Sequence, residues 1–129
     1  MRNYRDLKVW EKAHRLTVAV YRVSKNFPRE ELFGLTSQMR RSSMSIGANL
    51  AEGCGRRSDG EMGRYIQIAM GSAAELSYHL LLARDLNLLD EGSYERLYDD
   101  AGEVSRMLSA LSQAVRNHGT IPERLRAKG

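Results

Sequence analysis

Cysteine, proline, histidine and aromatic side chains are all scarce in this sequence of 129 residues. The single cysteine, Cys54, excludes an internal disulfide framework and fits the reducing conditions of the cytoplasm. Two prolines and an aromatic content of 7% argue against a β-sandwich with its many turns. No apolar run approaches the roughly 18 residues of a membrane span, and the opening residues lack the apolar stretch of a signal peptide. We therefore expect a cytoplasmic protein without a membrane anchor.

Length and charge set the next limits. At roughly 150 residues per domain, the chain holds one domain with a single hydrophobic core. The net charge is +4, but residues 1–64 hold thirteen Lys and Arg against seven Asp and Glu, whereas residues 65–129 hold seven against nine. A sequence pI near 9.5 with the excess in one half favours a polyanionic partner such as nucleic acid. The alternative is that the basic first half neutralises the acidic second half.

Hydrophobic spacing predicts four amphipathic helices and no strands. Apolar positions recur at alternating steps of four and three, which is the spacing of a helix seam in a bundle. We expect the first helix to end before Pro28 and the second to run from about Glu31 to about Cys54. The repeating positions of the four helices are Val9, Ala13, Leu16, Val20, Val23 and Phe27; Leu32, Leu35, Met39, Ile46 and Leu50; Met62, Ile66, Ala69, Ala73, Leu76, Leu80, Ala83 and Asn87; and Tyr94, Leu97, Ala101, Val104, Leu108, Leu111 and Val115.

Capping residues and a glycine predict where the last two helices begin and end. Ser58 followed by Glu61 fits a capping box at the start of the third helix, and Asp90 is a candidate N-cap for the fourth. Gly119 ends the fourth helix, so we expect a bundle over residues 1–118 and a short, mobile basic tail over residues 119–129. Four long helices with short loops predict an all-α fold, an up-down-up-down antiparallel four-helix bundle.

The side chains that enzymes commonly use are absent or isolated. A di-metal bundle needs Glu-x-x-His pairs on two helices, and here Glu75 and His79 are the single pair, at a spacing of four. Cys54 lies in a turn whose arginines would favour its thiolate, but no histidine is near it in sequence and no catalytic or phosphate-loop motif accompanies it. We interpret that turn as a helix stop. We assign no catalytic residue, no metal and no cofactor, and we predict that the protein is not an enzyme.

A polar stripe follows the second predicted helix beside its apolar seam. The stripe consists of Arg41, Ser45, Asn49 and Glu52, and the third helix offers Ser72, Glu75 and His79 at matching steps. Because charged groups beside a core must be paired or hydrogen-bonded, we expect Arg41 or Asn49 to face Glu75. We interpret these residues as a structural polar network that sets helix register. A ligand pocket or a subunit contact is the alternative.

A basic face follows the first predicted helix. Regularly spaced cations on a rigid rod suit a phosphate backbone and give affinity with little sequence discrimination. We predict that nucleic acid is bound by these cations and by three more near the second helix: Arg5, Lys8, Lys12, Arg15 and Arg22, with Arg40, Arg56 and Arg57. The fourth helix carries an acidic stripe that would pair with this face in the alternative interpretation, within one chain or between copies. The stripe consists of Glu91, Glu95, Asp99 and Glu103.

Several motifs, in a shared order, carry a family resemblance. They are the opening Tyr4-Arg5-Asp6-Leu7-Lys8-Val9-Trp10, the segment from Arg41 to Ser45-Ile46, the run Asn49-Leu50-Ala51-Glu52-Gly53, and Gly71-Ser72 followed by Glu75-Leu76. In these motifs the chain resembles a bacterial four-helix-bundle family that was first identified as open reading frames within intervening sequences of 23S ribosomal RNA genes. The similarity spans about residues 4–116. Gly47-Ala48 stands where a proline and a small residue are common, and Cys54 stands where an aromatic residue is frequent. Neither departure changes the expected fold, but Cys54 weakens any aromatic contact that the loop makes in relatives.

The resemblance implies a four-helix bundle, in agreement with the periodicity, and a ring-like homopentamer. A related accessory protein of diversity-generating retroelements is a basic pentamer that binds nucleic acid and a reverse transcriptase. Family members have no established enzymatic activity and no settled molecular role. We therefore expect a non-catalytic homo-oligomer that binds RNA or DNA largely without sequence specificity. The alternative is an oligomeric scaffold whose basic face serves subunit assembly or a protein partner such as a reverse transcriptase.

Overall fold

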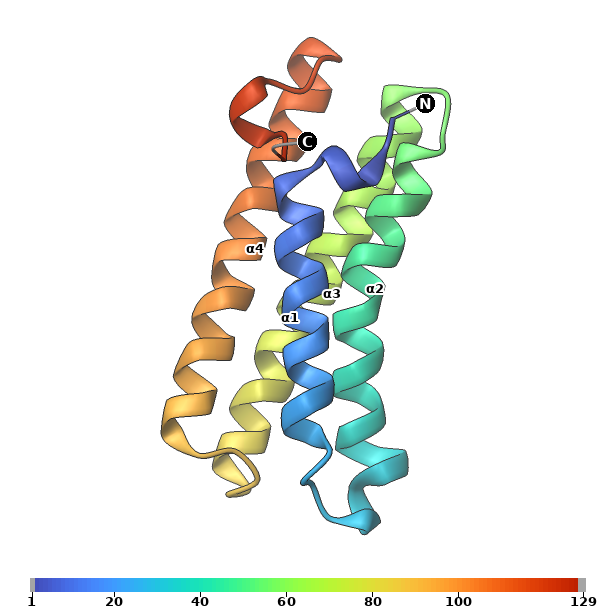
Figure 1. The fold of residues 1–129 in the computed structure, drawn as a ribbon. Helices are drawn as coiled ribbons and strands as arrows, with labels where there is room; N and C mark the ends of the chain where they lie inside the picture. Colours follow the sequence, from blue (N-terminus) through green and yellow to red (C-terminus); the bar gives the residue numbers. More distant parts are fainter. Residues whose placement is uncertain (1, 128–129) are drawn as a thin grey trace.

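Four long helices dominate the computed structural model of the chain, which describes residues 2–127 apart from the side chain of His118 (Figure 1). The helices are α1 (Lys8–Ser24), α2 (Ser37–Cys54), α3 (Asp59–Asp85) and α4 (Glu91–His118). Successive helices run in opposite directions, and α1 and α4 also pack against each other, which closes the bundle. The prediction of an all-α up-down-up-down four-helix bundle is confirmed.

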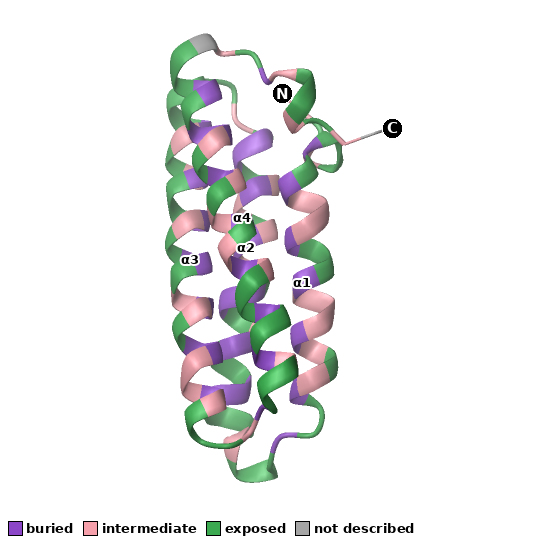
Figure 2. Ribbon diagram, turned by 90° about the vertical axis from the view of Figure 1, so that its left-hand side faces the viewer, coloured by how far each residue is buried: buried purple, intermediate pink, exposed green. Residues whose placement is uncertain are grey.

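The core follows the predicted seams of the long helices. All seven apolar positions of α3 from Met62 to Ala83 are buried, and so are the seven positions of α4 from Tyr94 to Val115. Each helix turns a buried stripe inward and an exposed face outward (Figure 2). Because burying one Leu or Ile side chain contributes roughly 1.5–3 kcal/mol, this shared interior is the main source of stability.

Small residues on α2 allow its neighbours to approach closely. A Cβ atom added at Gly53 would lie 2.9 Å from the Cβ of Tyr65 on α3, a distance that real Cβ atoms do not tolerate. On the other side of α2, a Cβ at Gly47 would lie 3.3 Å from the indole Nε1 of Trp10. These two glycines therefore act as packing positions, where a side chain would separate the helices.

The second long helix begins later than predicted. Residues 29–36 form a 3-10 turn, η2 (Arg29–Glu31), and a π-helical turn, η3 (Leu32–Thr36), before α2 starts at Ser37. Within η3, Gly34 has non-helical backbone angles, with φ of −112° and ψ of −113°, so the chain kinks there and the three-and-four spacing does not extend back across it. Leu32, predicted to face the core, is 44% exposed for this reason, and Phe33 is 93% exposed.

Both predicted N-caps are confirmed. The Ser58 hydroxyl accepts a hydrogen bond from the Glu61 N–H at 3.1 Å, and the Asp90 carboxylate accepts one from the Ser93 N–H at 2.7 Å. The last predicted seam position of α3 is wrong, because Asn87 lies two residues beyond the end of the helix, in the left-handed conformation with φ of 61°. Asn tolerates this conformation better than other side chains and so terminates the helix.

The C-terminal residues lie against the N-terminal segment instead of forming a free tail. Ala127 N–H donates to the Asp6 carbonyl at 2.6 Å, Arg126 forms an isolated antiparallel bridge with Leu7, and Ile121 is buried. These contacts place both termini and the α2–α3 loop at the same end of the bundle (Figure 1). The last two residues of the predicted tail lie outside the described part of the chain.

Candidate functional site

Positive charge is concentrated at one end of the bundle. Dividing each helix at its midpoint gives a basic end, defined as residues 2–16, 46–72 and 105–127, and an acidic end, defined as residues 17–45 and 73–104. The basic end holds twelve Lys and Arg against six Asp and Glu, and the acidic end holds seven against ten, so their formal charges are +6 and −3. Both termini and the α2–α3 loop belong to the basic end (Figure 1). The sequence order hides this asymmetry because the basic end draws on three separate segments.

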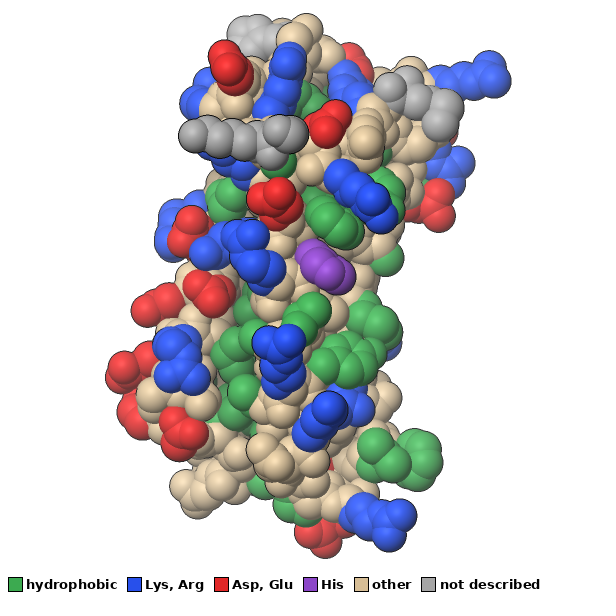
Figure 3. All heavy atoms as spheres, in the orientation of Figure 1, with side chains coloured by type: hydrophobic (Ala, Val, Ile, Leu, Met, Phe, Trp, Pro, Cys, Tyr) green, Lys and Arg blue, Asp and Glu red, His purple; other side chains and the backbone are tan. Residues whose placement is uncertain are grey.

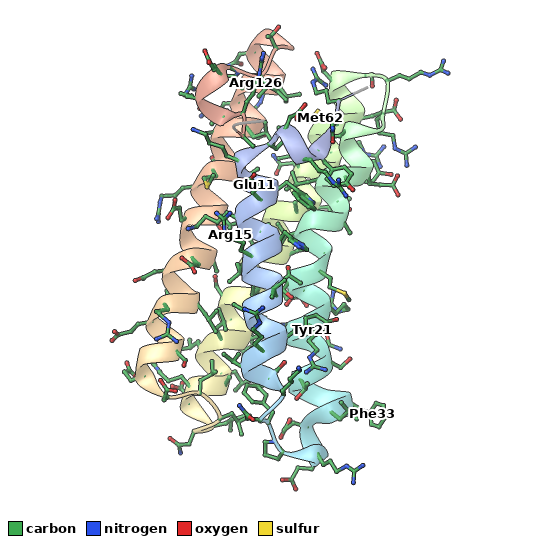
Figure 4. The ribbon with its side chains drawn as sticks, viewed as in Figure 1. Glu11, Arg15, Tyr21, Phe33, Met62 and Arg126 are labelled. Atoms are coloured by element: carbon green, nitrogen blue, oxygen red, sulfur yellow. The ribbon has the colours of Figure 1, made fainter. Side chains whose placement is uncertain are left out.

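Most cations of the predicted basic face along α1 are open to solvent. Arg5, Lys8 and Arg22 are exposed and have no ion pair within residues 2–127. Arg15 lies 3.9 Å from Glu11 one turn away on the outer surface, an exposed pair that contributes about 0.3–0.5 kcal/mol (Figure 4). In the space-filling view, Lys and Arg side chains follow α1 and acidic side chains gather over the lower part of α4 (Figure 3).

Lys12 does not belong to the open part of this face. Its ammonium group lies 3.4 Å from a carboxylate oxygen of Asp100 and 3.3 Å from one of Glu103, both on α4. The acidic stripe therefore contributes one member, Glu103, to a pair within the chain, and Asp100 was missed because it lies beside the stripe. Arg57 in the α2–α3 loop is exposed and remains available to a ligand.

Two of the predicted nucleic-acid-binding arginines have structural partners in the chain. The guanidinium of Arg40 lies 4.7 Å from the ring centroid of Tyr21, across the α1–α2 contact. The guanidinium of Arg56 donates to the Tyr65 hydroxyl at 2.7 Å, stacks 4.9 Å from the same ring, and lies 3.1 Å from the Glu52 carboxylate. Because both side chains are half-buried and engaged, they have little freedom to follow a phosphate backbone.

The polar stripes of α2 and α3 meet along the α2–α3 contact. Arg41 forms an ion pair with Glu75, and the Ser72 hydroxyl donates to the Ser45 hydroxyl at 2.8 Å. The Asn49 amide turns back within α2 and donates to the Ser45 carbonyl at 2.8 Å. Since these groups satisfy one another, the cluster ties two helices together and leaves no open set of groups aimed at a ligand.

Two buried titratable side chains are held neutral by their surroundings. Burial lowers the pKa of His79 from the usual 6.5, although nearby Glu75 raises it; the imidazole Nδ1 lies 3.0 Å from the Ser42 hydroxyl. Burial likewise raises the pKa of the Cys54 thiol, against the opposing effect of Arg2. A buried, protonated thiol is a poor nucleophile, so Cys54 packs in the core and does not support covalent catalysis.

Other classes of site receive no support from the described residues. Within residues 2–127 there is no group of three or more His, Cys, Asp or Glu side chains placed to hold a metal ion. Among the same residues, no helix combines the length and apolarity needed to cross a bilayer.

Three surface grooves, of about 490, 410 and 340 Å³, all lie at the basic end. The largest, which we call the α3–α4 groove, lies between the start of α3 and the end of α4. Its lining residues are Asp59, Gly60, Gly63, Arg64, Gln67, Ser112, Val115, Arg116 and Gly119. This groove was not predicted from the sequence, although its lining positions on the two helices, 60, 63, 64 and 67 and 112, 115, 116 and 119, share the same helical spacing.

Comparison with known proteins gives a family but no activity. Residues 5–110 match the 23S rRNA-intervening sequence protein family. A solved structure of a protein of unknown function from the S23 ribosomal protein family of Bacteroides thetaiotaomicron is 26% identical, with a TM-score of 0.74 over 81% of this chain and 98% of that chain. No curated protein gives a significant match. The chain therefore belongs to the 23S rRNA-intervening sequence protein family.

Proposed function

We propose that the protein is a non-catalytic homopentamer that binds RNA or DNA through its basic end, largely without sequence specificity. The observation that carries this proposal is the charge of +6 on one end of the bundle against −3 on the other. Gathering like charges at one end raises the free energy of the folded state, and a bound polyanion offsets that repulsion. Each phosphate that a cation neutralises also releases counterions, which favours binding at low salt.

Exposed cations of the basic end provide the phosphate contacts. Arg5, Lys8 and Arg57 are exposed and lack ion pairs in the described chain, so binding does not require them to give up an internal partner. At the basic end, the aromatic rings are engaged within the chain: Trp10 stacks on His14 with ring centroids 5.1 Å apart, Tyr4 packs edge-on against Trp10, and Tyr65 lies against the Arg56 guanidinium. Phosphate contacts without base stacking give affinity for a backbone and little discrimination between sequences.

Assembly into a ring would multiply this surface. In a ring with cyclic symmetry, every subunit has the same orientation relative to the ring axis. Unless the bundles are perpendicular to that axis, the basic ends of all copies therefore lie on the same face of the ring. Several copies of a weak phosphate surface on one face bind a long polyanion with an avidity that no single copy has. Apolar side chains are available for contacts between copies, since Ile68 is 50% exposed and Tyr78 is 59% exposed.

The test compares two triple variants that remove the same charge from opposite ends. Arg5→Ala/Lys8→Ala/Arg57→Ala acts on the basic end, and Arg22→Ala/Lys25→Ala/Arg29→Ala removes three exposed cations from the acidic end. We expect wild-type affinity for RNA and for duplex DNA to fall steeply with salt, and the first variant to reduce the slope of log K against log salt by about 2–3. The second variant should leave the slope near the wild-type value. A flat salt response, or equal losses in both variants, would contradict the proposal.

A protein-interaction scaffold is the second candidate function. It is favoured by Phe33, which is 93% exposed and points away from the bundle at the acidic end (Figure 4). In that case the basic end would serve subunit assembly or a protein partner, such as the reverse transcriptase of the related retroelement system. Light scattering on Arg5→Glu/Lys8→Glu/Arg57→Glu separates the two functions. Loss of the oligomer would favour the scaffold, and an intact oligomer that no longer binds nucleic acid would favour the first proposal.

A further inference from the structure

The α3–α4 groove has the size and the polar lining of a ligand site. Its volume of about 490 Å³ falls within the roughly 300–1,000 Å³ typical of small-molecule sites. At its floor, the Gln67 amide Nε2 donates to the Ser112 hydroxyl at 3.3 Å, which joins the two helices. Ser112 is buried, whereas Gln67 is exposed along the groove. The amide oxygen of Gln67 therefore remains free to accept a hydrogen bond from a ligand.

The groove presents unpaired positive charge. Arg64 from α3 and Arg116 from α4 are exposed, line opposite walls, and have no ion pair within the described residues. The one acidic side chain in the lining, Asp59, is already paired, because Arg2 donates to its carboxylate at 3.0 Å. Two guanidinium groups on facing walls are suited to grip one phosphate, since each offers paired N–H donors in a planar arrangement.

Two glycines open the groove without an internal reason to be glycine. A Cβ atom added at Gly60 or Gly63 would meet no other atom within 4 Å, unlike one at Gly53, where Tyr65 leaves no room. Glycine destabilises a helix relative to alanine. Since there is space for a Cβ atom at both positions, packing within the chain does not explain why they are glycine. Their absent side chains let an external group approach the α3 backbone between the arginine and the glutamine.

We propose that the α3–α4 groove seats one unpaired nucleotide of the bound nucleic acid. Its phosphate lies between Arg64 and Arg116, and its sugar or base lies over Gly63 against the Gln67 amide. This inference rests on the proposed nucleic-acid binding and adds a strand preference to it. The exposed cations of the basic end bind a phosphate backbone in any form, whereas a groove of this size accepts a nucleotide only when it is not held in a base pair. The protein therefore prefers single strands, loops or ends over a continuous duplex.

A substitution that fills the groove without changing its charge tests this inference. Gly63→Leu places a side chain inside the groove, and Gly71→Leu is the matched control, because it lies on the same helix, is equally open and lies outside the groove lining. The probes are a 20-nucleotide single-stranded RNA of mixed sequence and the corresponding duplex. The leucine side chain would displace the nucleotide and so break its hydrogen bonds to the charged arginines, each of which contributes to the binding free energy. We therefore expect Gly63→Leu to weaken single-strand binding by about tenfold or more. Duplex binding, and both affinities of Gly71→Leu, should stay near wild type.

Each departure from this pattern overturns the inference in a distinct way. Unchanged single-strand binding by Gly63→Leu, with a steep salt response retained, removes the groove from the site and leaves the proposed function intact. Wild-type protein that binds neither probe at low salt overturns both. A change of oligomer mass in Gly63→Leu, measured by light scattering, would assign the groove to a contact between copies.

A second measurement identifies the group that is bound. NMR titration with adenosine 5′-monophosphate should shift the amide signals of Gly60 and Gly63, and the shifts should disappear in Arg64→Gln/Arg116→Gln. Adenosine alone should give no response at the same concentration. Equal responses to inorganic phosphate and to the nucleotide would reduce the groove to an anion site and overturn the assignment of a nucleotide.

Discussion

The two ends of the bundle are built by the same packing and differ in their surfaces. The basic end carries both termini, three grooves and twelve cations, whereas the acidic end carries the α1–α2 and α3–α4 connections, ten acidic side chains and the exposed Phe33. All four long helices carry buried apolar residues at both ends, so packing does not require the charge to be separated. The comparison shows that the surface of this fold varies independently of its core, and that a functional surface is best sought where charge and grooves coincide.

The largest difference in stability between the ends is expected at their left-handed residues. Gly119 at the basic end and Asn87 at the acidic end have φ values of 62° and 61°. Gly119→Ala should lower the free energy of unfolding by at least about 1–2 kcal/mol, because a Cβ is disfavoured in this conformation. The new atom would also lie 2.7 Å from the Asp59 carboxylate, which pairs with Arg2. Urea denaturation of the variant measures the loss.

Asn87→Ala is the matched control for that prediction. It introduces the same residue in the same backbone conformation at the other end, and we expect a smaller loss, of about 1 kcal/mol or less, because Asn itself tolerates the left-handed region only moderately. The difference between the two variants combines two effects: glycine is less strained than asparagine at the start, and the new Cβ at position 119 crowds Asp59. Equal losses would contradict this prediction.

A medium effect is expected at the N-cap that begins α3 at the basic end. Ser58→Ala removes the acceptor of the Glu61 N–H and should cost about 1 kcal/mol, whereas Ser58→Gly should cost only a few tenths. Thermal or urea denaturation measures both changes. At the acidic end, Asp90→Ala should also destabilise the fold, since Asp90 caps α4 in the same way. A Ser58→Ala variant as stable as wild type would mean that the start of α3 is held by the Arg2 contacts alone.

The smallest effect concerns pH and is confined to the acidic end, where His79 is buried. Because the pKa of His79 is lowered by burial, the unfolded state binds a proton more readily than the folded state below about pH 6.5. The free energy of unfolding should therefore be highest above this pH and should decrease as the pH falls below it. His79→Asn, which keeps a group able to bond Ser42, should flatten this dependence in urea denaturation at pH 5 and pH 8. An NMR titration midpoint of His79 at or above 6.5 would disprove the prediction.

Residues with strong periodic or capping signals were predictable, and residues at irregular turns were not. The seams of α3 and α4 and the caps at Ser58 and Asp90 follow from spacing and local hydrogen bonding, which involve neighbours within one or two turns. Leu32 was misplaced because the chain kinks at Gly34, where the backbone angles are not helical, and the spacing of the apolar residues does not report such a kink. The prediction of four antiparallel helices did not depend on this segment.

The candidate site was less predictable because it depends on contacts between distant residues. Regular spacing placed Lys12 with the open cations, but the fold brings Asp100 and Glu103 of α4 against it. Arg40 was counted as a free cation, and the fold stacks it on Tyr21. Whether a charged side chain is free or paired depends on which helix packs beside it. The residue spacing within one helix does not show which helix that is.

The helices, their caps and the all-α bundle follow from the amino-acid sequence, because the period of apolar residues and hydrogen bonds between near neighbours specify them. The family resemblance follows from the sequence as well. The axial separation of charge, the pairing of Lys12 and the α3–α4 groove arise only when the chain is folded. Each of these joins segments that are far apart in the chain, and antiparallel packing brings the start of α3 beside the end of α4. Residue spacing within a helix specifies which face is buried. The charge distribution and the grooves of the surface depend on how the helices pack together.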